Sequence, residues 1–136
     1  MKRLIFDEDH EMFRDSVRKF MQAEISPQVE RWREQGICDK DAFLQAGEQG
    51  LLCMWVDEKY GGMGIEDFRF EQILIEETRR HGDLGLFLTL HSRLVGPYIG
   101  HLGSEALKQR LLPQCISGET ILGIAMTEPG AGSDLA

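Results

Sequence analysis

The stretch that decides the fold is Ala-Met-Thr-Glu-Pro-Gly-Ala-Gly-Ser-Asp, at residues 125–134. Pro129 fixes its own φ and pushes the residue before it toward extended geometry, so a regular helix cannot run through this stretch. Gly130 and Gly132 allow positive φ and a close approach of the backbone to another group. Consecutive amides in such a turn can converge on a partial negative charge. The stretch therefore has the composition of a ligand-binding loop.

Two hydroxyls add to this interpretation. Thr127 and Ser133 can hydrogen-bond a carbonyl, a ring nitrogen or a phosphate. The loop is not a Walker loop, which needs Gly-Lys followed by Ser or Thr, and it is not the G-x-G-x-x-G dinucleotide fingerprint. Composition alone leaves two interpretations open, a loop that holds a ligand and a surface turn that ends a strand.

The overall composition excludes several classes of protein. The net charge is −8, which argues against a nucleic-acid partner and against an anionic membrane surface. No apolar stretch reaches transmembrane length. Cys38, Cys53 and Cys115 form no C-x-x-C pair, so we expect reduced thiols and neither a disulfide framework nor a zinc site. Acidic residues follow soon after the first position, unlike a secretory or mitochondrial leader, and we expect a cytoplasmic protein.

Hydrophobic periodicity predicts helices along most of the chain. Apolar residues recur at steps of four and three from Phe13 to Phe20, behind a suitable N-cap at Asp7. Pro27 interrupts this pattern, because proline kinks a helix interior. The sequence leaves open one bent helix or two abutting helices, ending at Gly36.

Three further helices are expected, over residues 39–48, over residues 68–80 and from Ser104 to a point before Pro113. Residues 84–99 form the most apolar segment, and a helix that is apolar nearly all round belongs inside a fold. If the parts that cover this helix are missing from the chain, we expect its apolar surface to be exposed and to promote self-association.

The composition changes from helical to extended near residue 120. Residues 121–126 are short and apolar and lie between a glycine turn and Pro129, which predicts a buried strand. We therefore divide the chain into a helical domain over residues 1–120 and the start of a β-domain over residues 121–136. The glycine-rich stretch at residues 57–64 is interpreted as a plain connector.

Residues 125–134 resemble the first signature of the acyl-CoA dehydrogenase family, a strand that ends in T-E-P-G-A-G-S-D. The order of elements resembles the amino-terminal part of that family over essentially the whole chain, and Ile124 to Thr127 look most like the long-chain-type members. The resemblance implies a mainly α fold, the amino-terminal helical bundle domain of these enzymes, with the first strand of the following β-domain at the carboxy terminus. One departure is Val56-Asp57, where many relatives have a proline.

The family's chemistry follows from the resemblance. Its members oxidise acyl-CoA to trans-2-enoyl-CoA with FAD, in fatty-acid metabolism: a glutamate removes the α-proton while a β-hydride passes to flavin N5. That glutamate lies in a carboxy-terminal helical region that this sequence does not contain, so no catalytic residue is assigned and Glu128 is not the base. For the 136 residues alone, we expect an inactive helical packing module.

The resemblance also implies binding residues. Met126 and Thr127 would meet the isoalloxazine edge, with the Thr127 hydroxyl near N5 and O4, and Ser133 would contact acyl-CoA or the outer edge of the flavin. The full set expected at the cofactor is Ile124, Ala125, Met126, Thr127, Gly132 and Ser133. The leucines expected along the acyl-chain tunnel are Leu86, Leu90 and Leu94, which stack at i, i+4 and i+8 and for which ordinary core packing is the alternative.

The expected partners are acyl-CoA as substrate, electron-transfer flavoprotein as acceptor and further copies of the intact protein in a tetramer or dimer. A second possibility keeps the fold and changes the chemistry to that of an acyl-CoA oxidase or a related flavin monooxygenase. The four histidines show no metal-ligand spacing and are expected to be structural or solvent-facing.

Overall fold

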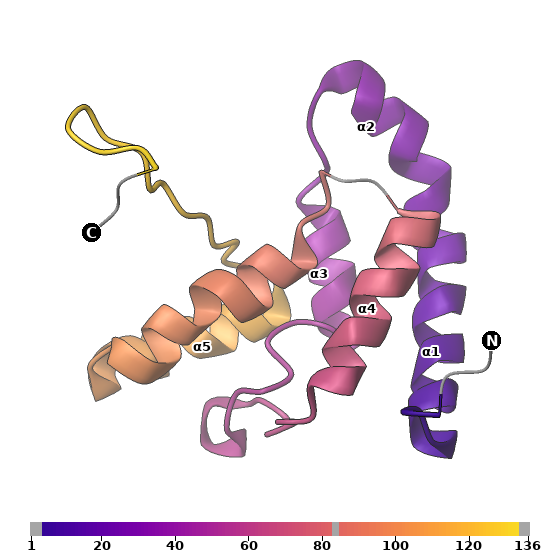
Figure 1. Ribbon diagram of the computed structural model, residues 1–136, viewed down its shortest axis with the longest axis horizontal. Helices are drawn as coiled ribbons and strands as arrows, with labels where there is room; N and C mark the ends of the chain where they lie inside the picture. The colour runs from indigo at the N-terminus through magenta and orange to yellow at the C-terminus, as the bar shows by residue number, and fades with distance from the viewer. Residues whose placement is uncertain (1–3, 83–84, 134–136) are drawn as a thin grey trace.

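The computed structural model describes residues 4–82 and 85–133 and is mainly helical, as predicted (Figure 1). These two ranges contain five α-helices and no strand; the helices are α1 (Glu8–Phe20), α2 (Val29–Gln35), α3 (Asp41–Glu48), α4 (Phe68–His81) and α5 (Glu105–Ser117). None of the helices in the same ranges is long and apolar enough to cross a bilayer. The predicted turn at Asp83 and the first residue of the apolar segment, Leu84, lie outside the described ranges.

The first helical arm is one bent helix. Helical conformation continues from α1 through the π-turn η1 (Met21–Ile25) and the 3₁₀-turn η2 (Ser26–Gln28) into α2. Asp7 caps α1 as predicted, because its side chain accepts from the His10 amide at 3.2 Å. The hydrogen bond between the Asp7 carboxylate and the His10 ring, together with this backbone bond, lowers the pKa of Asp7. Pro27 lies in the first turn of η2, where its missing donor is tolerated. The bend occurs where π and 3₁₀ turns replace the α-helical ladder.

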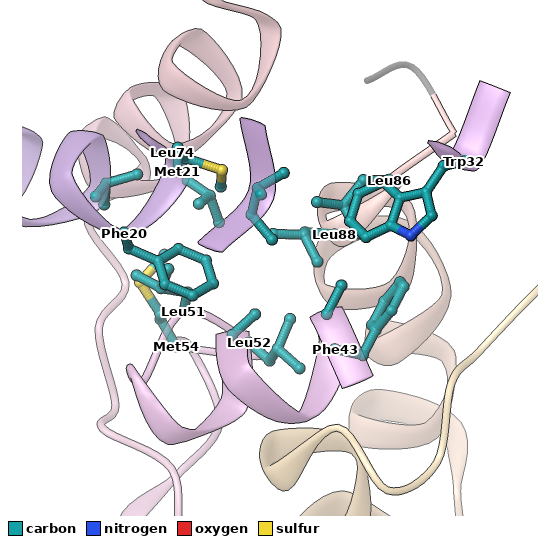
Figure 2. Close-up of a cluster of buried hydrophobic side chains, with 14 residues drawn as sticks. Phe20, Met21, Trp32, Phe43, Leu51, Leu52, Met54, Leu74, Leu86 and Leu88 are labelled. Carbon is teal, nitrogen blue, oxygen red and sulfur yellow. The ribbon is translucent and has the colours of Figure 1, made fainter. Parts of the chain in front are cut away.

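The apolar core lies where α1, α4, α3 and the segment after α3 meet. Figure 2 shows Phe20 and Met21 beside Leu74, opposite Leu51 and Leu52. Leu86, Leu88 and Trp32 close the same cluster on the side of α2, and all of these side chains are buried.

A buried ionic cluster joins α1 to α4. The Glu77 side chain on α4 is 0% exposed, and it accepts from Arg18 Nε at 3.1 Å and from Arg18 Nη2 at 3.2 Å. Arg14 Nη1 lies 3.4 Å from the same carboxylate and donates to Glu76 at 2.7 Å. Burial acts to raise the pKa of Glu77, but the hydrogen bonds and charges of Arg18 and Arg14 outweigh it, so the pKa lies below its ordinary value of 4.5. Glu77 is therefore ionised and paired inside the fold.

The apolar segment forms a helix with two unlike sides. Helical residues run from 88 to 102 and include the π-turns η4 (Leu90–Val95) and η5 (Tyr98–Leu102). His91 and Ser92 are fully buried, whereas Leu94 and Tyr98 are about half exposed. The prediction that this helix lies wholly inside the fold is wrong for the described structure, since one face lies against the core and the other lines an open groove.

Helix α5 does not stop before Pro113, contrary to the prediction. It continues to Ser117 and is closed by Gly118 at φ +80°. Pro113 is exposed and removes the bond to the Gln109 carbonyl, which is on the exposed surface and can bond water. Leu112 and Cys115 on either side of the proline are buried, so packing holds the last turn in place.

The predicted strand at residues 121–126 is not formed. This segment is extended, and Ile121, Ile124 and Met126 are exposed by 42%, 37% and 53%. A strand needs the backbone groups of a neighbouring strand as partners, and the described part of the chain supplies none. What remains is a tight turn in which Glu128 and Ala131 exchange hydrogen bonds of 2.8 and 3.1 Å.

The glycine-rich stretch is more ordered than a plain connector. Asp57 caps the 3₁₀-turn η3 (Glu58–Tyr60) by accepting from the Lys59 amide at 2.9 Å. The Tyr60 hydroxyl donates to Glu105 at the start of α5 at 2.8 Å. The turn is therefore held by a side-chain cap and a tertiary hydrogen bond.

The ionic cluster predicts an acid-sensitive fold. Glu77→Gln leaves Arg14 and Arg18 without their buried counter-charge and should lower the free energy of unfolding by about 3 kcal/mol at pH 7, measured by urea denaturation. Because the folded-state pKa of Glu77 is lowered, its contribution is present above about pH 4.5 and is lost as the pH falls through the folded value. The variant should therefore lose less stability than the parent on acidification.

Glu11→Gln is the matched control. Glu11 also pairs with Arg14, at 3.3 Å, but its side chain is 57% exposed. Exposed pairs contribute about 0–1 kcal/mol, so this variant should unfold close to the parent. Equal losses in the two variants would show that burial of Glu77 does not strengthen the cluster.

Candidate functional site

An open groove runs between α4 and the helix that contains η4. Its volume is about 420 Å³, and it is lined by Phe68, Ile75, Thr78, Arg79, Leu86, Phe87, Thr89, Leu90, Arg93 and Leu94. The three leucines expected along an acyl-chain tunnel therefore share one cavity. Leu86 is buried at the base, while Leu94 is 47% exposed. Such a surface can bind an apolar chain.

A charged pair that the sequence reasoning missed lies behind the wall of the groove. Glu71 on α4 is fully buried, and its Oε2 lies 3.5 Å from Nε of Arg93, one of the groove-lining residues. Burial raises the pKa of Glu71, although Arg93 and Thr89 oppose this rise. The Arg93 guanidinium also lies 5.6 Å from the centre of the Phe68 ring. The groove is thus apolar along its leucines and has two arginines, Arg79 and Arg93, in its wall.

A signal for this pair was present in the sequence. Arg93 falls three positions after Leu90 in an otherwise apolar segment, and Glu71 falls among the apolar residues of the preceding helix. A charge on an apolar helical face is costly unless it is paired, so each residue implied a partner. The pairing itself depends on how α4 and η4 pack, which spacing within one helix cannot show.

The expected cofactor loop is exposed. In Figure 1 residues 124–133 extend away from the helices, and Ile124, Met126 and Thr127 face solvent. Within the described ranges, none of the backbone amides from residue 123 to residue 127 donates to another protein group. Gly132 and Ser133 are exposed as well, and Asp134 lies outside the described residues.

The two loop glycines do not use the conformational freedom expected of them. Neither Gly130 nor Gly132 is among the residues with positive φ. A Cβ at either position would meet no atom within 4 Å, so within the described chain nothing approaches the loop closely. The free amides and the Thr127 hydroxyl suit a planar ring rich in hydrogen-bond acceptors, but the described chain supplies no wall to enclose one.

The structure does not bring the loop and the groove together. Figure 1 shows the loop on the far side of the η4–η5 helix from α4, which forms one wall of the groove. Leu86, Leu90 and Leu94 thus converge, and Ile124, Ala125, Met126, Thr127, Gly132 and Ser133 follow one another along an extended chain. The two groups form separate parts of a site.

The remaining residues that could carry chemistry are Glu128 and the cysteines. Glu128 is exposed at the turn, and Cys38, Cys53 and Cys115 are reduced cysteines, of which Cys53 and Cys115 are buried. Burial raises the pKa of Cys53 to about 12 and that of Cys115 to about 11, which makes both poor nucleophiles. Across residues 4–82 and 85–133, no group of three or more His, Cys, Asp or Glu side chains could hold a metal ion.

His91 has a role that the sequence did not reveal. It is fully buried, its Nδ1 accepts from the Leu122 amide at 3.1 Å, and its Nε2 lies 2.9 Å from the Cys115 carbonyl. Burial lowers the pKa of this histidine. A histidine on an apolar helix was the available signal, and it did not identify these partners.

Comparisons with known proteins identify relatives over nearly the whole chain. Residues 7–119 match the family described as acyl-CoA dehydrogenase, N-terminal domain. The long-chain specific acyl-CoA dehydrogenase of Rattus norvegicus mitochondria is 42% identical over 133 residues, covering 98% of this chain and 31% of the relative. The chain therefore spans about a third of the length of the curated relatives it matches.

Solved structures give the same result. An acyl-CoA dehydrogenase from Geobacillus kaustophilus superposes with a TM-score of 0.91 at 44% identity, over 98% of this chain and 35% of that one. An acyl-CoA dehydrogenase from Bacillus anthracis complexed with FAD gives a TM-score of 0.87 at 31% identity, over 99% of this chain and 23% of that one.

The ion pair between Glu71 and Arg93 predicts that mutations of these two residues affect stability non-additively. Arg93→Met leaves the Glu71 carboxyl buried without its counter-charge and should destabilise the fold by about 2–3 kcal/mol. Adding Glu71→Leu should recover much of this loss, because the two charges are then removed together. A double-mutant cycle in urea should give a coupling energy of about 1–3 kcal/mol. Simple additivity would mean that the two groups do not act as a pair.

Proposed function

Since the chain belongs to the acyl-CoA dehydrogenase family, we propose that it is the amino-terminal part of an FAD-dependent enzyme that oxidises acyl-CoA to trans-2-enoyl-CoA in fatty-acid β-oxidation. The observation that carries this proposal is the groove in which Leu86, Leu90 and Leu94 meet, in a chain that also carries the loop at residues 125–134. Residues 1–120 are its helical domain, and residues 121–136 begin its β-domain.

In this proposal the groove holds the acyl chain. The leucines remove methylene groups from water, at about 0.8 kcal/mol for each buried CH₂. Thr78 and Thr89 also line the groove. The half-exposed face of Leu94 and Tyr98 is then the side that the rest of the enzyme covers. That covering would exclude water from the reacting carbons, which favours removal of a proton from a weak carbon acid.

The exposed loop holds the cofactor in the same proposal. Backbone groups at Met126 and Thr127 and the Thr127 hydroxyl would hold the edge of the flavin ring, and Ser133 would contact acyl-CoA or the outer flavin edge. Ile124, Ala125 and Gly132 complete the contact set. When bound, FAD supplies the acceptor for the hydride. The residues of this chain orient the ring and bind the acyl chain, and the proton-abstracting glutamate comes from a part beyond them.

The remaining expectations belong to this proposal. Electron-transfer flavoprotein is the acceptor, the intact protein is a tetramer or dimer, and its setting is cytoplasmic, although the curated relative from Rattus norvegicus is named as mitochondrial. The alternative of an acyl-CoA oxidase or flavin monooxygenase is not favoured, because the relatives reported above are named dehydrogenases.

The intact protein gives the direct test. Purified with FAD, it should show flavin absorbance that bleaches when acyl-CoA is added without oxygen, and electron-transfer flavoprotein should reoxidise it. Leu90→Trp should fill the groove and lower kcat/KM for a long acyl chain about 10- to 100-fold, with a smaller loss for a short one. Steady peroxide formation in place of acceptor reduction would select the oxidase alternative, and absence of flavin would refute the proposal.

Leu102→Trp is the matched control for the groove variant. Leu102 is 79% exposed at the end of η5 and does not line the groove. The same increase in side-chain size there should leave the ratio of long-chain to short-chain kcat/KM unchanged. An equal shift of that ratio in both variants would show that the groove does not determine which chain length the enzyme prefers.

The 136-residue chain alone should bind FAD weakly. Small-molecule sites bury most of their ligand, and the loop at residues 124–133 is exposed on the described chain. Titration followed by flavin fluorescence should give a Kd far above about 1 μM. A Kd of about 1 μM would require about 8 kcal/mol of binding free energy. A submicromolar Kd would show that this chain already encloses the ring.

A further inference from the structure

The His91 ring is held in one protonation state and one orientation. Because Nδ1 accepts from the Leu122 N–H at 3.1 Å, the ring proton is on Nε2, which donates to the Cys115 carbonyl at 2.9 Å. The Phe43 ring packs edge-on against the imidazole, with 5.7 Å between centroids. The side chain is 0% exposed. Both ring nitrogens are therefore used, and the ring has no room to turn.

The bond to Leu122 is the last one that ties the extended segment to the helices. Thr120 is bonded back to Gln114 through its amide, at 3.0 Å. Beyond Leu122, the described residues 123–133 form hydrogen bonds only within the turn between Glu128 and Ala131. The direction in which the chain leaves the helical part is thus set at Leu122, two residues before Ile124.

His91 also belongs to the helix that forms the groove. It follows Leu90 directly and precedes Leu94 by three positions, and both leucines line the groove. One rigid side chain therefore connects the helix that carries the groove to the backbone that leads into the cofactor loop. No other hydrogen bond in the described structure makes this connection.

We propose that His91 is a positioning residue for the flavin: it fixes where the backbone enters the cofactor loop relative to the acyl groove. This inference rests on the function proposed above. Its physical basis is the sensitivity of a reaction to placement, since a shift of about 1 Å between reacting groups can lower a rate about 100-fold. A fully buried ring with two tertiary hydrogen bonds resists such a shift, whereas a van der Waals contact alone does not.

Two variants of the intact, FAD-loaded protein separate the two bonds of the ring. His91→Asn places an amide oxygen near the position of Nδ1, so it can still accept from Leu122 but cannot reach Cys115. His91→Gln places an amide nitrogen near the position of Nε2, so it can still donate to Cys115 but offers no acceptor to Leu122. Both variants shorten or reshape a buried side chain, and both should lower the melting temperature.

The cofactor readout should follow the Leu122 bond and not stability. We expect His91→Gln to weaken FAD binding about five- to tenfold, the range of one hydrogen bond, to shift the visible flavin spectrum and to lower kcat more than it raises KM. His91→Asn should keep the FAD Kd within about twofold of the parent. Equal weakening in both variants, weakening in His91→Asn alone, or no weakening in either would overturn the inference.

Leu122→Pro provides a second route if the buried variants do not fold. It removes the same N–H from an extended residue without touching the ring, and it should reproduce the flavin changes expected for His91→Gln. A parent protein that holds no FAD would refute both this inference and the proposed function. A parent with normal flavin chemistry and a Leu122→Pro variant with unchanged FAD binding and spectrum would refute the positioning role alone.

Discussion

The fold depends on the requirement that a carboxylate placed in its interior must be neutralised there. Glu77 is ionised without exposure to solvent because arginine side chains surround it. Arg14 and Arg18 reach it from α1, and Arg80 of α4 lies 3.4 Å from it. The ion pairs from Arg14 and Arg18 to Glu77 join α1 to α4 across their interface. Helix α4 in turn supplies Thr78 and Ile75 to the groove. The wall of the groove is therefore formed by the same helix that carries this ionic contact.

Local rules made much of the fold predictable. The cap at Asp7, the bend near Pro27 and the start of α5 at Ser104 follow from the chemistry of a few neighbouring residues, and the structure confirms each of them. The predictions are wrong where contacts between residues far apart in the sequence determine the local structure. Burial of Cys115 carries α5 past Pro113, and the absence of a partner strand among the described residues leaves 121–126 unpaired. Periodicity within one segment contains no information about either contact.

In the candidate site, too, local spacing predicted some features and tertiary contacts determine the others. Spacing of four residues predicted Leu86, Leu90 and Leu94 on one helical face. They do share a cavity, but Leu86 lies before the helix, which begins at residue 88, and reaches the cavity from the preceding loop. The Glu71–Arg93 pair and the His91–Leu122 bond join residues from separate elements. Each involved a polar residue that looked out of place on an apolar face, so the sequence showed where a partner was needed without showing which residue it was. Resemblance supplied the cofactor residues 124–133, and their function stays a prediction.

The bond between His91 and Leu122 also has a consequence for the order of events during synthesis. Among the described residues, the side chains that form the apolar clusters lie at or before Leu122. The helical part can therefore fold as it leaves the ribosome, before any β-domain of the proposed longer protein has been made. During that interval the leucine groove and the unpaired edge at residues 121–126 are both open to solvent, and exposed apolar surface and unpaired strands favour aggregation. By accepting from the Leu122 amide, His91 would then also hold the start of the 121–126 segment against the helices while the rest of the proposed longer protein is being made.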